Sequence, residues 1–330
     1  MAERHPTMLQ TADGRELEVV VDGSRDGLLV IYHSGTPSAA LSYPLFTREA
    51  QARGLRLASY SRPGYAGSTP RFGRSVADAV DDVQVVADNL EAEQFLTFGW
   101  SGGGPHALAC AALLGKRCLA AATVAGVAPY DAEGLDWLAG MGQENVAEFT
   151  AARAGVDELT AFLSQHADAM RTITADDVAD SLGGLVSDVD KAAITGELAD
   201  YLAGSFRRAV SRGTDGWRDD DLAFCAPWGF DTEEIAVPVS VWQGTEDKMV
   251  PHAHGAWLAE HVSGARANLW TARDTCPSPP KPGASSTTSS SSPATDSSGR
   301  PSAGRPSGVR STRWTPCATA GPRPRPTPRA

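Results

Sequence analysis

The chain has 330 residues, a formal net charge of −11 at pH 7, and 42% hydrophobic and 21% charged side chains, which is typical of a globular protein. An acidic chain lacks the clustered Lys and Arg that nucleic-acid phosphates require, and no apolar run approaches the ~18 residues of a membrane span, so neither nucleic acid nor membrane is an expected partner. Five irregularly spaced cysteines predict no disulfide framework and no zinc site, and an N-terminus without an apolar segment predicts no secretory signal, so we expect a cytoplasmic protein.

Strand and helix patterns alternate over the first 125 residues. Short apolar runs predict strands at 16–21, 28–32, 56–60, 94–98 and 118–125. Apolar side chains at three- to four-residue spacing predict a helix between Val76 and Leu90, and a second helix is predicted at 106–114. This alternation indicates a mostly parallel sheet that is flanked by helices.

The pattern changes between residues 129 and 231. Helical stretches follow one another without strands, at 135–141, 146–152, 158–170, 176–185 and 192–210. After them come a strand at 237–242, a helix at 256–261 and a last strand at 267–270. We therefore predict an α/β core formed by residues 1–128 and 232–272, with a helical cap at 129–231 inserted over one end of the sheet.

The sequence Gly99-Trp100-Ser101-Gly102-Gly103 lies where a predicted strand gives way to a helix. A Gly-x-Ser-x-Gly pattern indicates a catalytic serine when it lies at a strand-to-helix turn, as it is predicted to do here. A sharp turn there lifts the Ser101 hydroxyl above the sheet and aims it at the free N–H groups of the next helix. The alternative is a glycine-rich turn in which the serine is incidental.

Two further turns follow predicted strands, and the second of them is given no catalytic role. His33-Ser34-Gly35-Thr36-Pro37 follows an apolar strand, and Ser61-Arg-Pro-Gly-Tyr-Ala-Gly-Ser68 follows the next. Together with the Ser101 turn they make the chain resemble the α/β-hydrolase superfamily over residues 19–270. The resemblance implies the α/β-hydrolase fold and an oxyanion hole made by the backbone N–H groups of Thr36 and Gly102. An extra Ser34 departs from the family's His-Gly-x-Pro turn, and the alternative reading is a tight turn with a structural His33.

A third motif follows the predicted cap. Gly244-Thr-Glu-Asp247-Lys-Met-Val-Pro251 comes directly after a predicted strand and resembles the family's Gly-x-x-Asp-x-x-Val-Pro pattern. The resemblance implies that Asp247 is the acid of a catalytic triad, which orients a histidine and stabilises its charged form. Glu246 is the alternative acid, and a helix-capping Asp247 is the alternative role.

The family's triad histidine is missing from its expected place after the last strand. The seven histidines are at positions 5, 33, 106, 166, 252, 254 and 261. We interpret His252 and His254 as residues at the surface or facing the cap, since they follow Asp247 too closely to be the base, and His106 as structural.

The composition also changes where the histidine is due. The 58 residues 273–330 include 12 Pro, 12 Ser and 8 Thr but only two large apolar side chains, Val309 and Trp314, so we expect them to be disordered. If Arg273 uses a codon ending in G, followed by GAC, ACC and TGT, reading from that G gives Gly-His-Leu-Ser, as the family's loop requires. The hypothesis is a frameshifted hydrolase; the alternative is a genuine disordered tail on a pseudo-enzyme.

The resemblance implies a serine hydrolase that acts on a small ester, lactone, amide or activated carbonyl substrate through an acyl-enzyme on Ser101. It implies no metal or organic cofactor, and a small-molecule substrate as partner. Without the histidine, this chain is expected to be nearly inactive. The alternatives are a catalytically silent binding protein and a cofactor-free haloperoxidase or acyltransferase. Four predicted cap aromatics either line the substrate space or pack in the core: Trp137, Phe149, Phe162 and Trp217.

Overall fold

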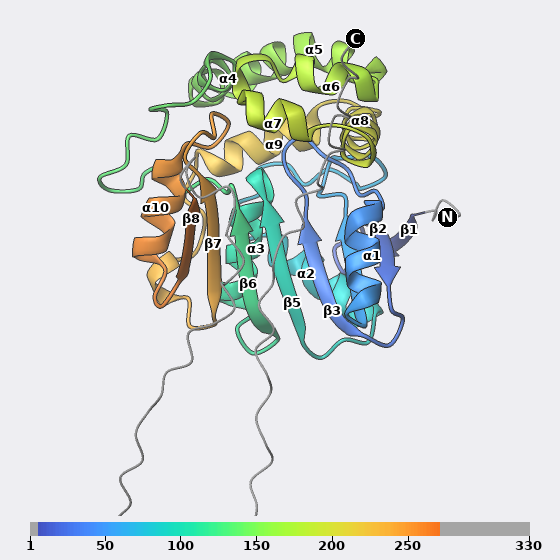
Figure 1. The fold of residues 1–330 in the computed structure, drawn as a ribbon. Helices are drawn as coiled ribbons and strands as arrows, with labels where there is room; N and C mark the ends of the chain where they lie inside the picture. Colours follow the sequence, from blue (N-terminus) through green and yellow to red (C-terminus); the bar gives the residue numbers. More distant parts are fainter. Residues whose placement is uncertain (1–5, 271–330) are drawn as a thin grey trace, which may run out of the picture. The chain divides into compact units, whose positions relative to one another are not determined.

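An eight-stranded sheet lies at the centre of this computed structural model, which describes residues 6–270 (Figure 1). The strand order is β1-β2-β4-β3-β5-β6-β7-β8. β2 is antiparallel to both β1 and β4, and the remaining neighbours are parallel. The strands are β1 (Thr7–Gln10), β2 (Glu16–Gly23), β3 (Leu28–His33), β4 (Leu55–Tyr60), β5 (Phe95–Trp100), β6 (Cys118–Val124), β7 (Val239–Gly244) and β8 (Arg266–Trp270).

Four α-helices pack directly on the sheet: α1 (Pro44–Ala52), α2 (Ala79–Asn89), α3 (Gly104–Leu113) and α10 (His252–His261). In Figure 1, α1 lies in front of the sheet, whereas α2 and α3 lie behind it. The mostly parallel sheet flanked by helices is therefore confirmed. None of the helices within residues 6–270 is both long enough and apolar enough to cross a membrane.

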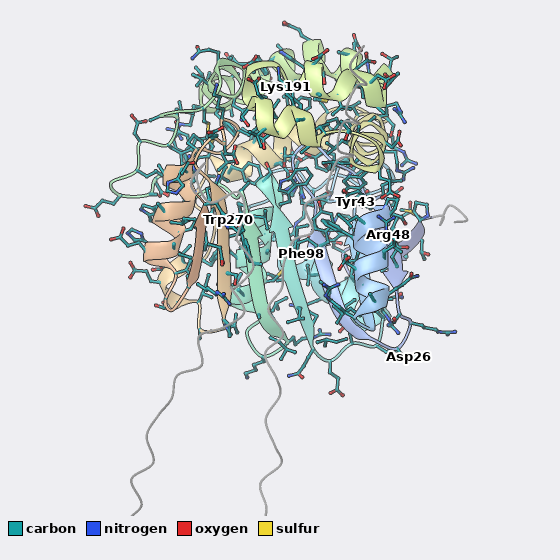
Figure 2. All side chains as sticks on the ribbon, in the orientation of Figure 1. Asp26, Tyr43, Arg48, Phe98, Lys191 and Trp270 are labelled. Atoms are coloured by element: carbon teal, nitrogen blue, oxygen red, sulfur yellow. The ribbon has the colours of Figure 1, made fainter. Side chains whose placement is uncertain are left out.

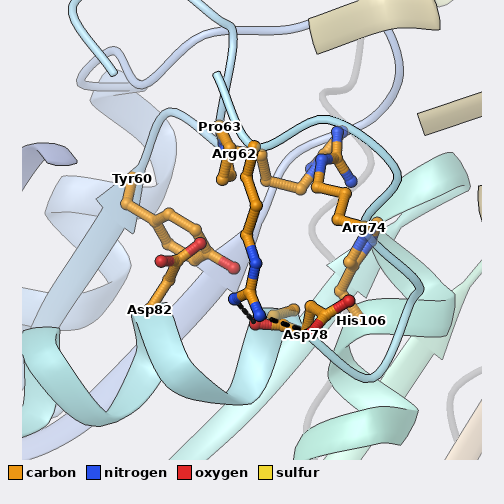
Figure 3. Close-up of a pocket in the computed structure, with 9 residues that line it drawn as sticks. Tyr60, Arg62, Pro63, Arg74, Asp78, Asp82 and His106 are labelled. Atoms are coloured by element: carbon orange, nitrogen blue, oxygen red, sulfur yellow. Dashed lines mark hydrogen bonds and ion pairs between the residues drawn. The ribbon is translucent and has the colours of Figure 1, made fainter. Parts of the chain in front are cut away.

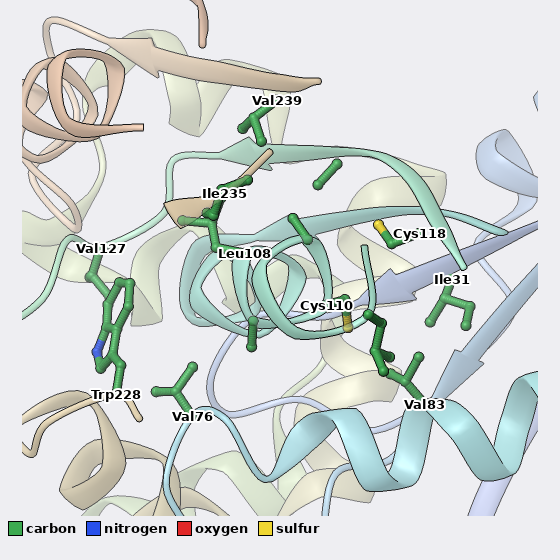
Figure 4. Packing of buried hydrophobic residues seen from close by; sticks show 14 of the residues in the cluster. Ile31, Val76, Val83, Leu108, Cys110, Cys118, Val127, Trp228, Ile235 and Val239 are labelled. Carbon is green, nitrogen blue, oxygen red and sulfur yellow. The ribbon is translucent and has the colours of Figure 1, made fainter. Parts of the chain in front are cut away.

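The core is centred on α3. Leu108 and Cys110 of this helix are fully buried and belong to one apolar cluster with Ile31 of β3, Val83 of α2 and Ile235 (Figure 4). The neighbouring strands β5, β6 and β7 alternate between buried residues and residues that are at least partly exposed. Burying each large aliphatic side chain contributes about 1.5–3 kcal/mol, so this cluster fixes α3 and the turn that precedes it.

The helical insertion (residues 143–224) lies between β6 and β7 and sits over the carboxyl ends of the parallel strands (Figure 1). It contains α4 (Gln143–Ala154), α5 (Val156–Thr172), α6 (Ala175–Ser181), α7 (Asp188–Ala193), α8 (Glu197–Ala209) and α9 (Asp215–Phe224), with a 3₁₀ turn at Gly183–Leu185. Further 3₁₀ turns lie at Ser101–Gly103 and Thr232–Glu234.

An aromatic cluster joins the insertion to the sheet. The ring of Tyr201 on α8 stacks on Tyr43, with centroids 4.8 Å apart, and Tyr32 of β3 stacks on Phe98 of β5 at 4.7 Å (Figure 2). Phe46 of α1 makes edge contacts with three of these rings. A cap over one end of the sheet is thus present, and the exact division at residues 129 and 231 stays a prediction.

Two predicted helices differ from the structure. Residues 135–141 form turns because Gly134 and Gly140 have φ values of +80° and +89°, and Trp137 between them folds inward to donate to the Ala128 carbonyl at 2.7 Å. The predicted helix at 192–210 is interrupted at Gly196, whose φ is +53°, so α7 ends before it and α8 begins after it.

Some elements were absent from the sequence prediction: β1, α1, α7 and α9. The tail predicted from residue 273 lies outside the described residues.

Candidate active site

The turn after β5 holds Ser101 in a left-handed conformation, with φ +52°. A Cβ atom placed on Gly99 would lie 2.0 Å from the Gly103 carbonyl oxygen, and one on Gly103 would lie 2.1 Å from the His33 carbonyl oxygen. Neither position can carry a side chain, because real Cβ atoms do not approach so closely. This tight strand-to-helix turn is the geometry expected of a nucleophile elbow.

The loop after β3 lies directly against this turn. β3 and β5 are parallel neighbours that pair His33 with Gly99, so their following loops meet at one edge of the sheet. A Cβ on Gly35 would lie 3.9 Å from Ser101 Oγ, and one on Gly102 would lie 2.4 Å from Thr36 Oγ1. The structure therefore brings together Ser101, Gly102 and Thr36, which the sequence had singled out separately.

A buried ion pair between Arg62 and Asp220 holds the loop after β3 through its backbone carbonyl groups. Arg62, which follows β4, is 2% exposed and donates from Nη1 to the Ser34 carbonyl oxygen at 2.6 Å and from Nη2 to the Gly35 carbonyl oxygen at 2.9 Å. Asp220 of α9 accepts from Arg62 Nη2 at 2.6 Å. Neither Arg62 nor Asp220 was among the residues predicted for the site. The sequence signal for a buried acid here was the run of three acids between Trp217 and Phe224, because three adjacent residues of a helix cannot all lie on one solvent-exposed face.

Asp247 follows β7, which is separated from β5 by β6 alone. Its Oδ1 accepts from the N–H groups of Met249 and Val250, each at 2.9 Å, and its Oδ2 accepts from Gln243 Nε2 at 3.0 Å. Burial raises the pKa of Asp247 to about 6, against the opposing effect of these hydrogen bonds. Within residues 6–270 this carboxyl group forms no ion pair, whereas Glu246 beside it is exposed.

His254 is fully buried, so it is not a surface residue, and it contacts Trp137 within the segment predicted as the cap. Its Nε2 donates to the Trp137 carbonyl oxygen at 2.9 Å, and its Nδ1 accepts from the Ala128 N–H at 3.1 Å. Burial lowers its pKa to about 4. The ring is neutral with both nitrogens occupied by backbone, and it cannot serve as a base for Ser101. The half-buried His252 is the first residue of α10.

His33 and His106 are both buried and hydrogen-bonded within the core. His106 donates from Nδ1 to the Gly102 carbonyl oxygen at 2.9 Å, and burial, followed by the Arg62 charge, lowers its pKa to about 3. His33 is 1% exposed, and its Nδ1 lies 3.3 Å from the Tyr60 hydroxyl. No histidine within residues 6–270 hydrogen-bonds the Ser101 hydroxyl.

A small cavity lies between the loop after β4, the start of α2 and His106 of α3 (Figure 3). Its free volume is about 10 Å³, and His106, Arg62 and Arg74 are among the residues that line it. His106 Nε2 and Arg74 Nε are buried without a hydrogen-bond partner in the described structure. The cavity has room for about one water molecule and is too small for a substrate.

Three of the four aromatic residues considered for substrate contact pack in the core. Trp137 and Phe149 meet edge to face with centroids 4.6 Å apart, and Trp217 donates from Nε1 to Glu148 at 2.6 Å; all three are at most 7% exposed. Phe162 is partly buried and stacks on His166, with ring centroids 4.3 Å apart.

Within residues 6–270 there is no group of three or more His, Cys, Asp or Glu side chains that could hold a metal ion.

A family model described as alpha/beta hydrolase fold matches residues 27–267. The chain belongs to this family. Membership confirms the predicted fold class and supports a hydrolase. No curated protein matches this α/β hydrolase at a significant level.

Solved structures share the fold. The α/β hydrolase resembles an alpha/beta hydrolase fold protein from Nakamurella multipartita, with 26% identity, a TM-score of 0.52, and coverage of 81% of this chain and 90% of that one. It is also similar to the enol-lactonase from Burkholderia xenovorans LB400 (20% identity, TM-score 0.52, 80% and 91% covered) and to the bromoperoxidase from Bacillus anthracis (21%, 0.55, 81% and 91%).

Proposed function

We propose that this α/β hydrolase is built as a serine hydrolase that acts on a small ester, lactone, amide or activated carbonyl through an acyl-enzyme on Ser101. The observation that carries the proposal is the left-handed Ser101 at the end of β5, against the loop that contains Thr36. A side chain held in a strained backbone conformation at the edge of the sheet is the arrangement that exposes a nucleophile to substrate.

In the proposed reaction Ser101 attacks the substrate carbonyl. The N–H groups of Thr36 and Gly102 stabilise the oxyanion, and α3, which begins at Gly104, adds the positive end of its dipole. Asp247 orients a histidine that takes the Ser101 proton and gives it to the leaving oxygen or nitrogen as the bond between that atom and the carbonyl carbon breaks. Water, deprotonated by the same histidine, then attacks the acyl group, which releases the acid and returns the proton to Ser101.

The base itself is the part that this chain lacks. A histidine loop is expected after β8, whose last residue, Trp270, is also the last described residue (Figure 2). The frameshift hypothesis places Gly-His-Leu-Ser at that point in an alternative frame. With no base, we propose that the 330-residue chain turns over substrate several orders of magnitude more slowly than a complete triad.

Fluorophosphonate labelling tests the proposal. We expect the chain with the alternative frame restored to be phosphonylated on Ser101, the 330-residue chain to react at least ~100-fold more slowly, and Ser101→Ala to stay unlabelled in both backgrounds. A restored chain that folds but remains unlabelled would support the silent binding protein instead. Because an enol-lactonase and a bromoperoxidase both share the fold, product analysis with peroxide or an alcohol acceptor separates hydrolysis from peroxidase or acyl-transfer activity.

A further inference from the structure

We propose that Asp220 of α9 is a positioning residue for the oxyanion hole, acting through Arg62 on the peptide group that carries the Thr36 N–H. The inference rests on the proposed function for the role of that N–H. A residue of the helical insertion thereby helps to position the oxyanion hole, whose N–H groups belong to loops that follow strands of the sheet.

Asp220 is the centre of a buried network. It is 0% exposed, and it accepts from Arg62 Nη2 at 2.6 Å, Arg74 Nη2 at 2.6 Å, the Tyr65 hydroxyl at 2.8 Å and Thr36 Oγ1 at 2.7 Å. These donors come from two loops, the one after β3, which contains Thr36, and the one between β4 and α2, which contains Arg62, Tyr65 and Arg74. The carboxylate therefore ties α9 both to the loop after β4 and to the loop after β3.

Arg62 carries this restraint to the backbone. Its Nη2 donates to the Gly35 carbonyl oxygen at 2.9 Å. That carbonyl and the Thr36 N–H belong to the same planar peptide group, so holding the oxygen fixes the direction in which the N–H points. Donation to the carbonyl also polarises the peptide and strengthens its N–H as a donor. The bond from Thr36 Oγ1 to Asp220 restrains the same residue from its side chain.

The positive charges of Arg62 and Arg74 need the Asp220 carboxylate as their counter-charge. Burial raises the pKa of Asp220, but the Arg62 and Arg74 guanidinium groups outweigh this effect and hold the pKa well below its usual range. The carboxylate is thus ionised between two guanidinium groups. Replacing it with a neutral side chain leaves two buried cations without a counter-charge, and they must move apart or recruit water.

Asp219 provides a matched control. It is the preceding residue of α9, is 3% exposed, and pairs through Oδ1 with Arg218 at 2.9 Å. Within the described residues it forms no hydrogen bond or ion pair with residues 33–37 or with Arg62, so Asp219→Asn changes a buried carboxyl group of the same helix without touching the oxyanion loop.

The test compares Asp220→Asn, Asp219→Asn and Thr36→Val with the parent in the full 330-residue chain. Thr36→Val keeps the backbone N–H and the side-chain shape but removes the bond to Asp220, and it remains informative if Asp220→Asn fails to fold. Two quantities are measured: amide hydrogen exchange of the peptide that contains Ser34–Thr36, and the limiting rate and half-saturation of Ser101 phosphonylation.

We expect Asp220→Asn to raise loop exchange and to lower the limiting phosphonylation rate, each by about tenfold or more, with half-saturation unchanged. Thr36→Val should give a smaller change of the same kind, and Asp219→Asn should match the parent. Folded Asp220→Asn and Thr36→Val chains that match Asp219→Asn in both measurements would overturn the inference. If the parent is not phosphonylated even with the alternative frame restored, the proposed function fails, and loop exchange alone decides whether Asp220 positions the loop.

Discussion

A Cβ atom on Gly99 would lie 2.0 Å from the carbonyl oxygen of Gly103, so the two ends of the Ser101 turn are in direct backbone contact. This contact closes the turn and sets where Ser101 stands above the sheet. It is also the feature of the site that is most sensitive to a single methyl group.

We expect Gly99→Ala to destabilise the fold by about 2–4 kcal/mol and to abolish Ser101 labelling, because the added methyl group must push the turn open. Urea unfolding and phosphonylation measure the two effects. Gly115→Ala is the matched control, since its Cβ would meet its nearest neighbours at 3.6 Å and 3.7 Å, an ordinary contact distance. If Gly99→Ala retains both the stability and the labelling of Gly115→Ala, the turn geometry described above is wrong.

The Asp247 carboxyl group predicts a pH dependence of stability. Its pKa is raised from 3.8 to about 6, so the proton favours the folded state: the stability it contributes is fully present below pH 3.8 and is lost as pH rises through about 6. The difference corresponds to roughly 3 kcal/mol. Asp247→Asn should therefore gain stability relative to the parent between pH 4 and pH 8, as read from paired denaturation curves. If the difference in stability between Asp247→Asn and the parent stays constant from pH 4 to pH 8, the Asp247 carboxyl group is either exposed or paired with a cation.

His254 predicts the opposite dependence. Burial lowers its pKa from 6.5 to about 4, so the stability it contributes is present above pH 6.5 and is lost as pH falls through about 4. His254→Phe leaves the Ala128 N–H and the Trp137 carbonyl without their partner, and we expect a loss of about 2–4 kcal/mol at pH 7.5. Thermal unfolding checks this against His166→Phe, whose parent side chain is exposed on α5. Equal melting temperatures for the two variants would contradict the assignment.

Two carboxyl groups meet between α4 and α9. Asp221 and Glu148 are neighbours, both Asp221 carboxyl oxygens are buried without a hydrogen-bond donor in the described structure, and burial raises the pKa of both residues. Glu148 also accepts from Trp217. Glu148→Gln keeps an acceptor for Trp217 and supplies a donor to Asp221. We therefore expect it to stabilise the chain at pH 8 by roughly 1–2 kcal/mol. Glu158→Gln, at an exposed position of α5, should have no such effect. Destabilisation by Glu148→Gln at pH 8 would indicate that both groups are ionised and held by other partners.

The sheet could be predicted because parallel strands in a helix-flanked sheet are short apolar runs, as β3 and β6 are. The Ser101 turn and the Thr36 loop could be predicted because each is a local motif, and the pairing of His33 with Gly99 brings the two together. These features are encoded within a few neighbouring residues.

The missed features depend on contacts between distant segments. α9 was missed because its three consecutive acids resemble a solvated loop, yet Arg62, Arg218 and Glu148 supply partners that the local sequence does not reveal. The burial of His254 was missed for the same reason, since its partners lie more than 100 residues earlier. Sequence spacing alone carries no record of such partners.

The most direct measurement of the central claim is hydrolysis of an activated aryl ester by the 330-residue chain, by the chain with the alternative frame restored, and by Ser101→Ala in the restored background. We predict that the restored chain hydrolyses the ester through an acyl group on Ser101, which is seen by intact mass. The 330-residue chain should turn over the same ester more slowly by about 10³-fold or more. Equal turnover by the 330-residue chain, or full turnover by Ser101→Ala, would contradict this prediction.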